Sequence, residues 1–196
     1  AYTYATNGIK ATPPFRVNYI DEKQIAQDIA RAKSQQPDAI IALMHWGEEY
    51  HSLPSKAQKA LADKLFSQGV THIIGSHPHV VQPIELRTDS AAATRRLLVY
   101  SLGNFISGMS ANKTDGGLMV RMTLEKHRQK TTLKHADYSL VWTLRPAHNA
   151  LKDYSLIPPS RIDSLQPSAQ YLFRRFLKHA RTLFEQHNTG IAEKEF

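Results

Sequence analysis

Two short apolar runs, each ending in histidine, constrain the fold of this 196-residue chain more than any other feature. Residues 39–44 run directly into His45, and residues 71–74 lead into the segment Gly75-Ser76-His77-Pro78-His79. An amphipathic helical pattern precedes each run, so helix and strand patterns alternate. This alternation predicts parallel strands joined by helical crossovers, and the continuous apolar runs predict strands that are buried on both faces.

The two predicted helices have recognisable start signals. Asp21 with Gln24, and Ser55 with Gln58, have the spacing of a capping box. The first helix should end before Pro37, and the second should end at Gly69. These signals fix the lengths of the crossovers and therefore the positions at which the following strands begin.

The remaining elements differ in pattern from the first part of the chain. Residues 118–124 and 138–144 read as an antiparallel pair of strands. A last amphipathic helix is predicted over residues 168–187. Further strands are predicted at residues 1–8, 80–86, 97–102 and 154–157. The fold class is therefore α/β, with parallel strands first and antiparallel strands later, and the length suits one domain over residues 1–196.

Composition excludes some classes of site and partner. The chain has no cysteine, which rules out disulfides, thiolate metal sites and cysteine nucleophiles. No apolar run approaches the roughly 18 to 20 residues of a membrane helix. The net charge of +8 favours anionic partners, although a solvated basic face explains much of it equally well. No nucleic-acid-binding module accompanies the charge, so we expect no nucleic acid partner.

His45, His77 and His79 are the candidate metal ligands. In a parallel sheet, groups that follow the strands gather at one edge, where ligands commonly bind. A neutral imidazole can offer one nitrogen to a divalent metal while the other is held by a neighbouring acceptor. A His-x-His pair taken alone also fits ordinary surface histidines, and the second strand exit at His45 strengthens the metal interpretation.

Glu48, Glu49 and Asn104 are candidate site residues of other kinds. A carboxylate near a metal can orient a ligand or act as an acid or base, but both glutamates could equally be solvated. Asn104 follows a strand and a glycine, where it could bind a ligand or simply form a turn. His51 and His72 are expected to be structural, because one sits in a polar loop and the other lies inside a strand.

Three motifs together resemble a known family. They are His-Trp-Gly-Glu-Glu-Tyr at 45–50, Gly-Ser-His-Pro-His-Val at 75–80 and Ser-Leu-Gly-Asn-Phe at 101–105. In this order and spacing they resemble the bacterial capsule synthesis protein CapA family, also called poly-γ-glutamate synthesis proteins. The resemblance covers residues 1–110, a family-like core, and leaves residues 111–196 as strands and a C-terminal helix.

That family resembles calcineurin-like metallophosphatases, which form a four-layer α/β sandwich around two divalent metal ions such as Mn, Zn or Fe. The resemblance implies that His77 and His79 each serve a different metal, and that His45 ends the preceding core strand. Glu49 and Asn104 would line the site and take part in catalysis. The Asp and Asn ligands of such a centre come from an N-terminal half. We therefore expect this chain to be the C-terminal portion of a larger domain, completed by that half or by another chain, with one mononuclear histidine site as the alternative.

The resemblance implies a metallophosphatase-like hydrolase of the cell envelope that acts on a phosphoester or anionic polymer in capsule or poly-γ-glutamate synthesis or processing. The alternative is a noncatalytic component that binds or exports an anionic capsular polymer. The expected location is extracytoplasmic, with membrane association only through segments that this chain does not contain. Metal-dependent turnover would separate the two functions.

Overall fold

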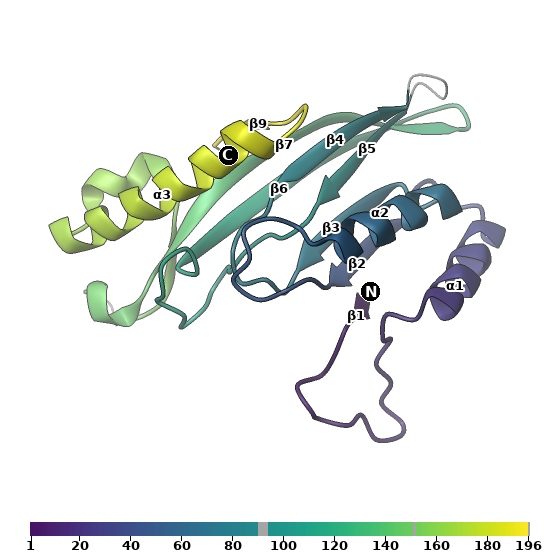
Figure 1. Cartoon of the computed structure of the whole chain (residues 1–196). Coiled ribbons are helices and arrows are strands. Elements are labelled where there is room, and N and C mark those ends of the chain that lie inside the picture. The colour runs from purple at the N-terminus through teal and green to yellow at the C-terminus, as the bar shows by residue number, and fades with distance from the viewer. Residues whose placement is uncertain (90–93, 151, 196) are drawn as a thin grey trace.

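A computed structural model describes residues 1–89, 94–150 and 152–195, which form two β-sheets and three α-helices (Figure 1). The first sheet has the strand order β1-β2-β3-β5-β4. The second sheet has the order β6-β7-β8, and β9 pairs with β7. The strands are β1 (Tyr2–Thr3), β2 (Ile41–His45), β3 (His72–Ser76), β4 (Ile84–Asp89), β5 (Thr94–Val99), β6 (Gly116–His127), β7 (Lys130–Leu144), β8 (Ser155–Ile157) and β9 (Ala192–Glu193).

The helices begin and end where the capping residues predict. Helix α1 (Glu22–Ser34) has Asp21 as N-cap, and the Asp21 carboxylate accepts from the Gln24 N–H. The Gln24 side chain donates instead to Asp28, so no complete capping box forms there. Helix α2 (Lys56–Gln68) has the complete box between Ser55 and Gln58. It ends at Gly69, whose left-handed backbone (φ 111°) suits a glycine.

Parallel pairing of β1, β2, β3 and β5 confirms the α/β class with parallel strands first. Strand β4 pairs antiparallel with β5 at the sheet edge. The register sets Met44 beside Gly75 and His45 beside Ser76. The chain therefore leaves β2 and β3 at the same level and at the same edge of the sheet, and both of these ends carry histidine, as the sequence predicts.

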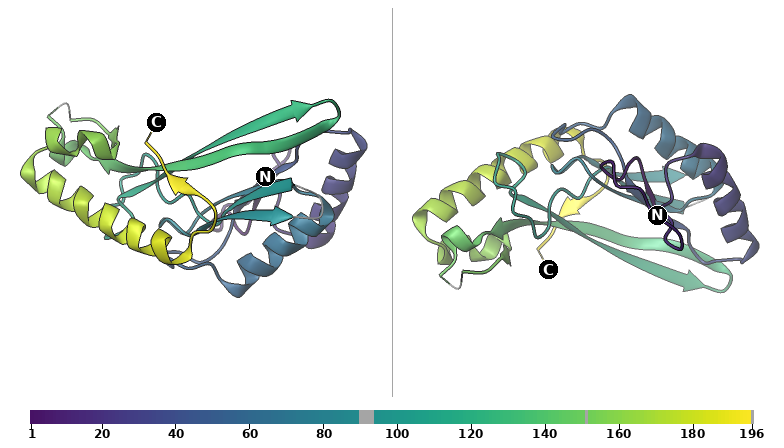
Figure 2. Two further views of the ribbon diagram at one scale, coloured as in Figure 1. Left: turned by 90° about the horizontal axis from the view of Figure 1, so that it is seen from above. Right: turned by 90° about the horizontal axis from the view of Figure 1, so that it is seen from below.

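The second sheet is built on a long antiparallel hairpin. Strands β6 and β7 pair from Gly116 with Trp142 to His127 with Lys130, with one irregularity between Thr123 and Leu124. Both strands are longer than the predicted segments 118–124 and 138–144, and the turn that joins them is short. Figure 2 shows this hairpin running along the first sheet, with α1 and α2 on the other side of that sheet.

Two hydrophobic cores lie between these layers. One lies between the first sheet and helices α1 and α2, and it includes Ile25, Leu65 and Leu98. The other joins the opposite face of β5 to the second sheet and to helix α3 (Pro167–His187). In this second core Trp142 stacks on Phe173 with ring centroids 5.6 Å apart. Alternating residues of β5 thus face different cores, which fixes the strand's register.

The prediction that residues 39–44 are buried on both faces is wrong. Ala42 and Met44 are buried under the helices, but Ile41 and Leu43 on the opposite face are 42% and 51% exposed. The second sheet packs mainly on β4 and β5 and does not cover β2 to the same extent. An apolar run cannot show which of its faces another layer will cover.

No helix among the described residues is long and apolar enough to cross a membrane. The predicted loop over residues 88–94 is in part outside the description, since residues 90–93 are not described. Two short 3₁₀ helices, η1 (Pro146–His148) and η2 (Pro159–Ser164), complete the described elements.

His72 should make the stability of the fold depend on pH. Its Nδ1 accepts from the Leu97 N–H at 3.0 Å, and burial, aided by the positive charge of Arg96, lowers its pKa. Because the unfolded chain then binds the proton more readily, stability is complete above about pH 6.5 and falls as the pH drops below it. We expect His72→Asn, which keeps an acceptor oxygen but cannot titrate, to lose less stability than the wild type between about pH 7.5 and about pH 5.

Urea unfolding at both pH values measures this effect. His45 and His77 titrate in both proteins, so the difference between wild type and variant isolates His72. Equal losses of unfolding free energy in the two proteins would show that His72 does not contribute.

Candidate metal centre

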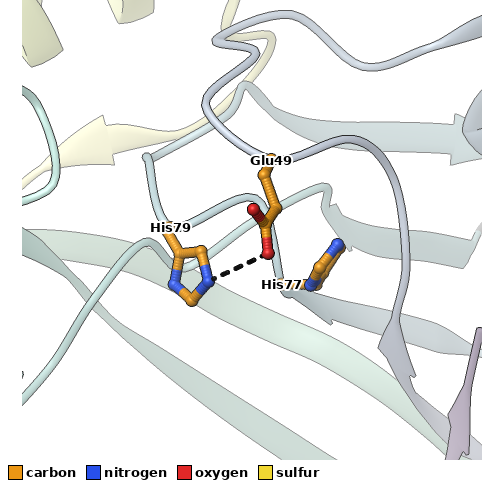
Figure 3. Close-up of side chains that lie close together, drawn as sticks. All are labelled: Glu49, His77 and His79. Carbon is orange, nitrogen blue, oxygen red and sulfur yellow. Dashed lines mark ion pairs between the residues drawn. The ribbon is translucent and has the colours of Figure 1, made fainter. Parts of the chain in front are cut away.

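Three side chains converge at the carboxyl edge of the first sheet: Glu49, His77 and His79 (Figure 3). Each offers one ligand atom, and these atoms lie within 4.8 Å of one another. The His79 Nε2 is 3.7 Å from the Glu49 Oε1. His77 is buried, whereas His79 and Glu49 are partly open to solvent. It is the only such group that the described part of the chain contains.

Backbone contacts bring Glu49 to the two histidines. Glu49 follows β2 in a loop, and the neighbouring Tyr50 N–H donates to the Pro78 carbonyl at 2.8 Å. Farther along the loop, the Gln82 side chain donates to the His51 carbonyl at 2.8 Å. The loop after β2 is therefore attached at two points to the segment after β3. This attachment places Glu49, and not Glu48, beside the histidines.

Asn104 controls the orientation of His79. The Asn104 amide nitrogen donates to the Thr114 carbonyl at 2.8 Å, which leaves its Oδ1 3.1 Å from the His79 Nδ1. Because that oxygen can only accept, we assign the ring proton to Nδ1. The Nε2 lone pair then faces the carboxylate of Glu49. Two electron-pair donors that face one another favour a cation between them.

The electrostatic surroundings favour the neutral form of His77 and His45. Burial lowers the pKa of His77, and the charges of His45 and His79 lower it further, while Glu49 acts in the opposite direction. Although His45 lies near the surface, desolvation also lowers its pKa, and the nearby His79 lowers that pKa further. A neutral imidazole has a free lone pair, which is the form that binds a metal.

His45 lies beside the three-residue group and not inside it. Its ring centroid is 4.7 Å from that of His77, and its Nδ1 is 3.3 Å from the Ser76 hydroxyl. The structure therefore places all three predicted histidines at one edge. A ligand role for His45 stays a prediction.

Two tyrosines that the sequence analysis did not single out also line the site. The Tyr4 ring lies 4.3 Å from that of His77, and the Tyr50 ring stacks on His79 at 5.9 Å. Tyr4 directly follows β1, which is shorter than the predicted strand at 1–8. Because that predicted strand runs past Tyr4, the strand-exit argument could not have found this residue. His51 and His72, which the sequence analysis expects to be structural, lie outside this group, His51 near Glu48 and His72 inside the first sheet.

The backbone at this turn adopts a conformation that non-glycine residues rarely take. His77 and His79 have φ of 104° and 60°, and Tyr50 has φ of 66°. Strain of this kind persists where the surroundings hold it, and it clusters at functional sites. The unfavourable backbone conformation of this turn lowers local stability, but it sets the direction in which the two imidazoles point.

The residues present fit one divalent metal ion. Two imidazoles and one carboxylate are the donor set of open catalytic zinc sites, and the same ligand types also suit manganese and iron. His77, His79 and Glu49 would hold the ion, and Asn104 would fix the His79 ring. Among the described residues no further histidine, aspartate or glutamate joins this group, so three ligands fit one ion better than two.

Comparison with known proteins agrees with the motifs at this site. The family model described as "Bacterial capsule synthesis protein PGA_cap" matches residues 1–109. The chain is 33% identical over 99 residues to the PGA biosynthesis protein CapA of Bacillus subtilis (strain 168), which covers 50% of this chain and 24% of that protein. It is 32% identical over 103 residues to the capsule biosynthesis protein CapA of Bacillus anthracis, covering 51% and 24%.

The chain thus spans about a quarter of the length of these curated relatives. The family match includes every residue of the candidate metal centre and ends before β6. Since it covers more than half of the 196 residues, the chain belongs to the bacterial capsule synthesis protein family PGA_cap.

Proposed function

We propose that this protein is a metal-dependent, metallophosphatase-like hydrolase of the bacterial cell envelope, acting in the synthesis or processing of an anionic capsular polymer such as poly-γ-glutamate. The observation that carries the proposal is the convergence of Glu49, His77 and His79 within 4.8 Å. Membership of the capsule synthesis family, and relatives whose names assign them to capsule or PGA biosynthesis, support the process, and the proposed location follows from that process.

Each residue of the site has a distinct part in this proposal. His77 and His79 would hold a divalent ion through neutral nitrogens, and Asn104 would keep the His79 ring proton on Nδ1. Glu49 would complete the donor set or accept a proton from an attacking water. When bound, a divalent ion supplies Lewis-acid polarisation and charge neutralisation for attack at phosphorus. Tyr4 and Tyr50 would limit the directions from which a substrate approaches.

We further propose that a second metal, if the reaction needs one, takes its ligands from another part of a longer protein or from a partner chain. The described residues gather one three-member donor group. The alternative function is noncatalytic binding or export of the anionic polymer. The net charge of +8 supports that alternative.

Hydrolysis of a chromogenic phosphate ester tests the proposal. The purified chain should show turnover only with Mn²⁺, Zn²⁺ or Fe²⁺ present, and should lose it with a chelator. The double variant His77→Ala, His79→Ala should be inactive, whereas Lys59→Ala, an exposed change in α2, should keep full activity. Metal binding without turnover in any of these ions would favour the noncatalytic alternative, and turnover that survives in the double variant would refute this centre as the catalyst.

A further inference from the structure

A cavity lies next to the metal centre along the chain, between helix α3 and residues 80–81, which follow His79 directly. Its volume is about 360 Å³, within the usual range for small-ligand sites. Part of its wall is apolar and comes from Val80, Val81, Phe176 and Leu183. Most of the wall belongs to α3, which lies outside the family match over residues 1–109.

The polar part of this cavity combines basic side chains with the neutral Ser52, Thr182 and Gln186. Lys113, Lys178 and His179 line it. Both lysines are exposed, and neither has a carboxylate partner within ion-pair distance among the described residues. Both also act electrostatically on His179, as does Arg175. Against these three cations stands one buried carboxylate, Asp115, which lies 3.8 Å from Arg175. The cavity therefore has an excess of positive charge.

His179 adds a directed donor. Its Nδ1 is shielded from solvent and has no hydrogen-bond partner in the described part of the chain. A proton on a shielded nitrogen without an acceptor is unfavourable, so the proton of the neutral ring belongs on Nε2, the nitrogen that remains accessible. Burial and the charges of Lys113, Arg175 and Lys178 lower the pKa of His179. An anion bound nearby would offset those charges.

We infer that this cavity binds a carboxylate carried on a short aliphatic chain. The two lysines and the His179 Nε2–H would receive the carboxylate, and the wall of Val80, Val81, Phe176 and Leu183 would contact the methylene groups. Inorganic phosphate would satisfy the cations but would leave the apolar wall without a partner. A long apolar ligand would exceed a cavity of about 360 Å³.

The site would serve the proposed function by holding one acidic side group of a polymer while the neighbouring metal centre acts on another part. This role of the cavity in the reaction rests on the proposed function. Its binding chemistry does not, because none of Lys113, Lys178 and His179 belongs to the metal centre. Binding measured without metal therefore tests the cavity separately from the catalyst.

Glutarate, a dicarboxylate with three methylene groups, is the probe. In metal-free protein it should shift the NMR signals of the Val80 and Val81 amides in a saturable way and raise the pKa of the His179 ring. The variant Lys113→Ala, Lys178→Ala should bind about tenfold more weakly. The matched control Lys23→Ala, Lys59→Ala removes the same charge from α1 and α2 and should bind as the wild type does.

Four results would overturn the inference. Equal binding of the neutral isostere glutaramide would show an apolar cavity without anion recognition. Equal binding of inorganic phosphate would show a general anion site. Glutarate binding that requires added metal, or that disappears in His77→Ala, His79→Ala, would place the ligand at the metal centre. Absence of saturable shifts in the wild type would exclude the site altogether.

Discussion

Replacing His77 and His79 together with alanine should abolish binding of divalent metal to this chain, whereas the wild type should bind about one ion per chain. The double change removes two of the three ligand atoms that lie within 4.8 Å of one another. Glu49 alone is a partly exposed carboxylate, which binds a transition metal weakly in water. The loss should be close to complete and not a modest weakening.

A graded effect is expected at Asn104, because that residue acts through His79. Asn104→Ala removes the acceptor of the His79 Nδ1 proton and should weaken metal affinity about 10- to 100-fold without abolishing it. Calorimetric titration with Zn²⁺ and Mn²⁺, beside elemental analysis of the purified protein, measures both variants. His127→Ala and His148→Ala, each away from the site, are matched controls that should bind as the wild type does.

Binding unchanged in the double histidine variant would contradict this assignment. A full loss in Asn104→Ala with an unchanged melting temperature would mean that Asn104 is itself a ligand. In that case its Oδ1 would bind the metal through the lone pair that the contact with His79 does not use.

Much of the site could be predicted because it follows from strand direction. Parallel strands that end in His45 and in the His77–His79 turn must deliver these residues to one edge. The residue pattern alone could not decide between the adjacent carboxylates Glu48 and Glu49, and only the family resemblance favoured Glu49. That choice depends on the hydrogen bond from Tyr50 to Pro78, which joins positions far apart in the chain.

Other features depended on contacts that no local pattern encodes. Asn104 has the expected position beyond a strand, but its orienting contact with His79 requires the Thr114 carbonyl at the start of the second sheet. The cavity beside α3 joins residues 80–81 to residues 176–186, about a hundred positions apart. The exposed face of β2 is likewise set by a distant part of the chain, because the second sheet does not extend over that face.

Gly75→Ala should be the most destabilising small substitution near the site. An added Cβ at Gly75 would lie 2.1 Å from the Tyr100 carbonyl oxygen and 2.5 Å from the Trp46 Nε1. Those two atoms form a buried hydrogen bond of 2.9 Å that passes over β3 at this glycine. The methyl group must therefore break that bond or separate β3 from its neighbours. Overpacking together with an unpaired buried donor should cost about 2–6 kcal/mol.

Urea unfolding of Gly75→Ala beside Gly108→Ala measures the effect. The control adds the same methyl group where the nearest side-chain atom, the Tyr154 hydroxyl, is 3.3 Å away, and it should change stability by no more than about 0.5 kcal/mol. Equal unfolding midpoints for the two variants would show that β3 shifts freely. Such freedom would also weaken the metal assignment, because Gly75 lies two residues before His77. A strand that could move to admit a methyl group would not hold two imidazoles and a carboxylate at fixed separations. The close packing at Gly75 and the geometry of the metal centre therefore depend on each other.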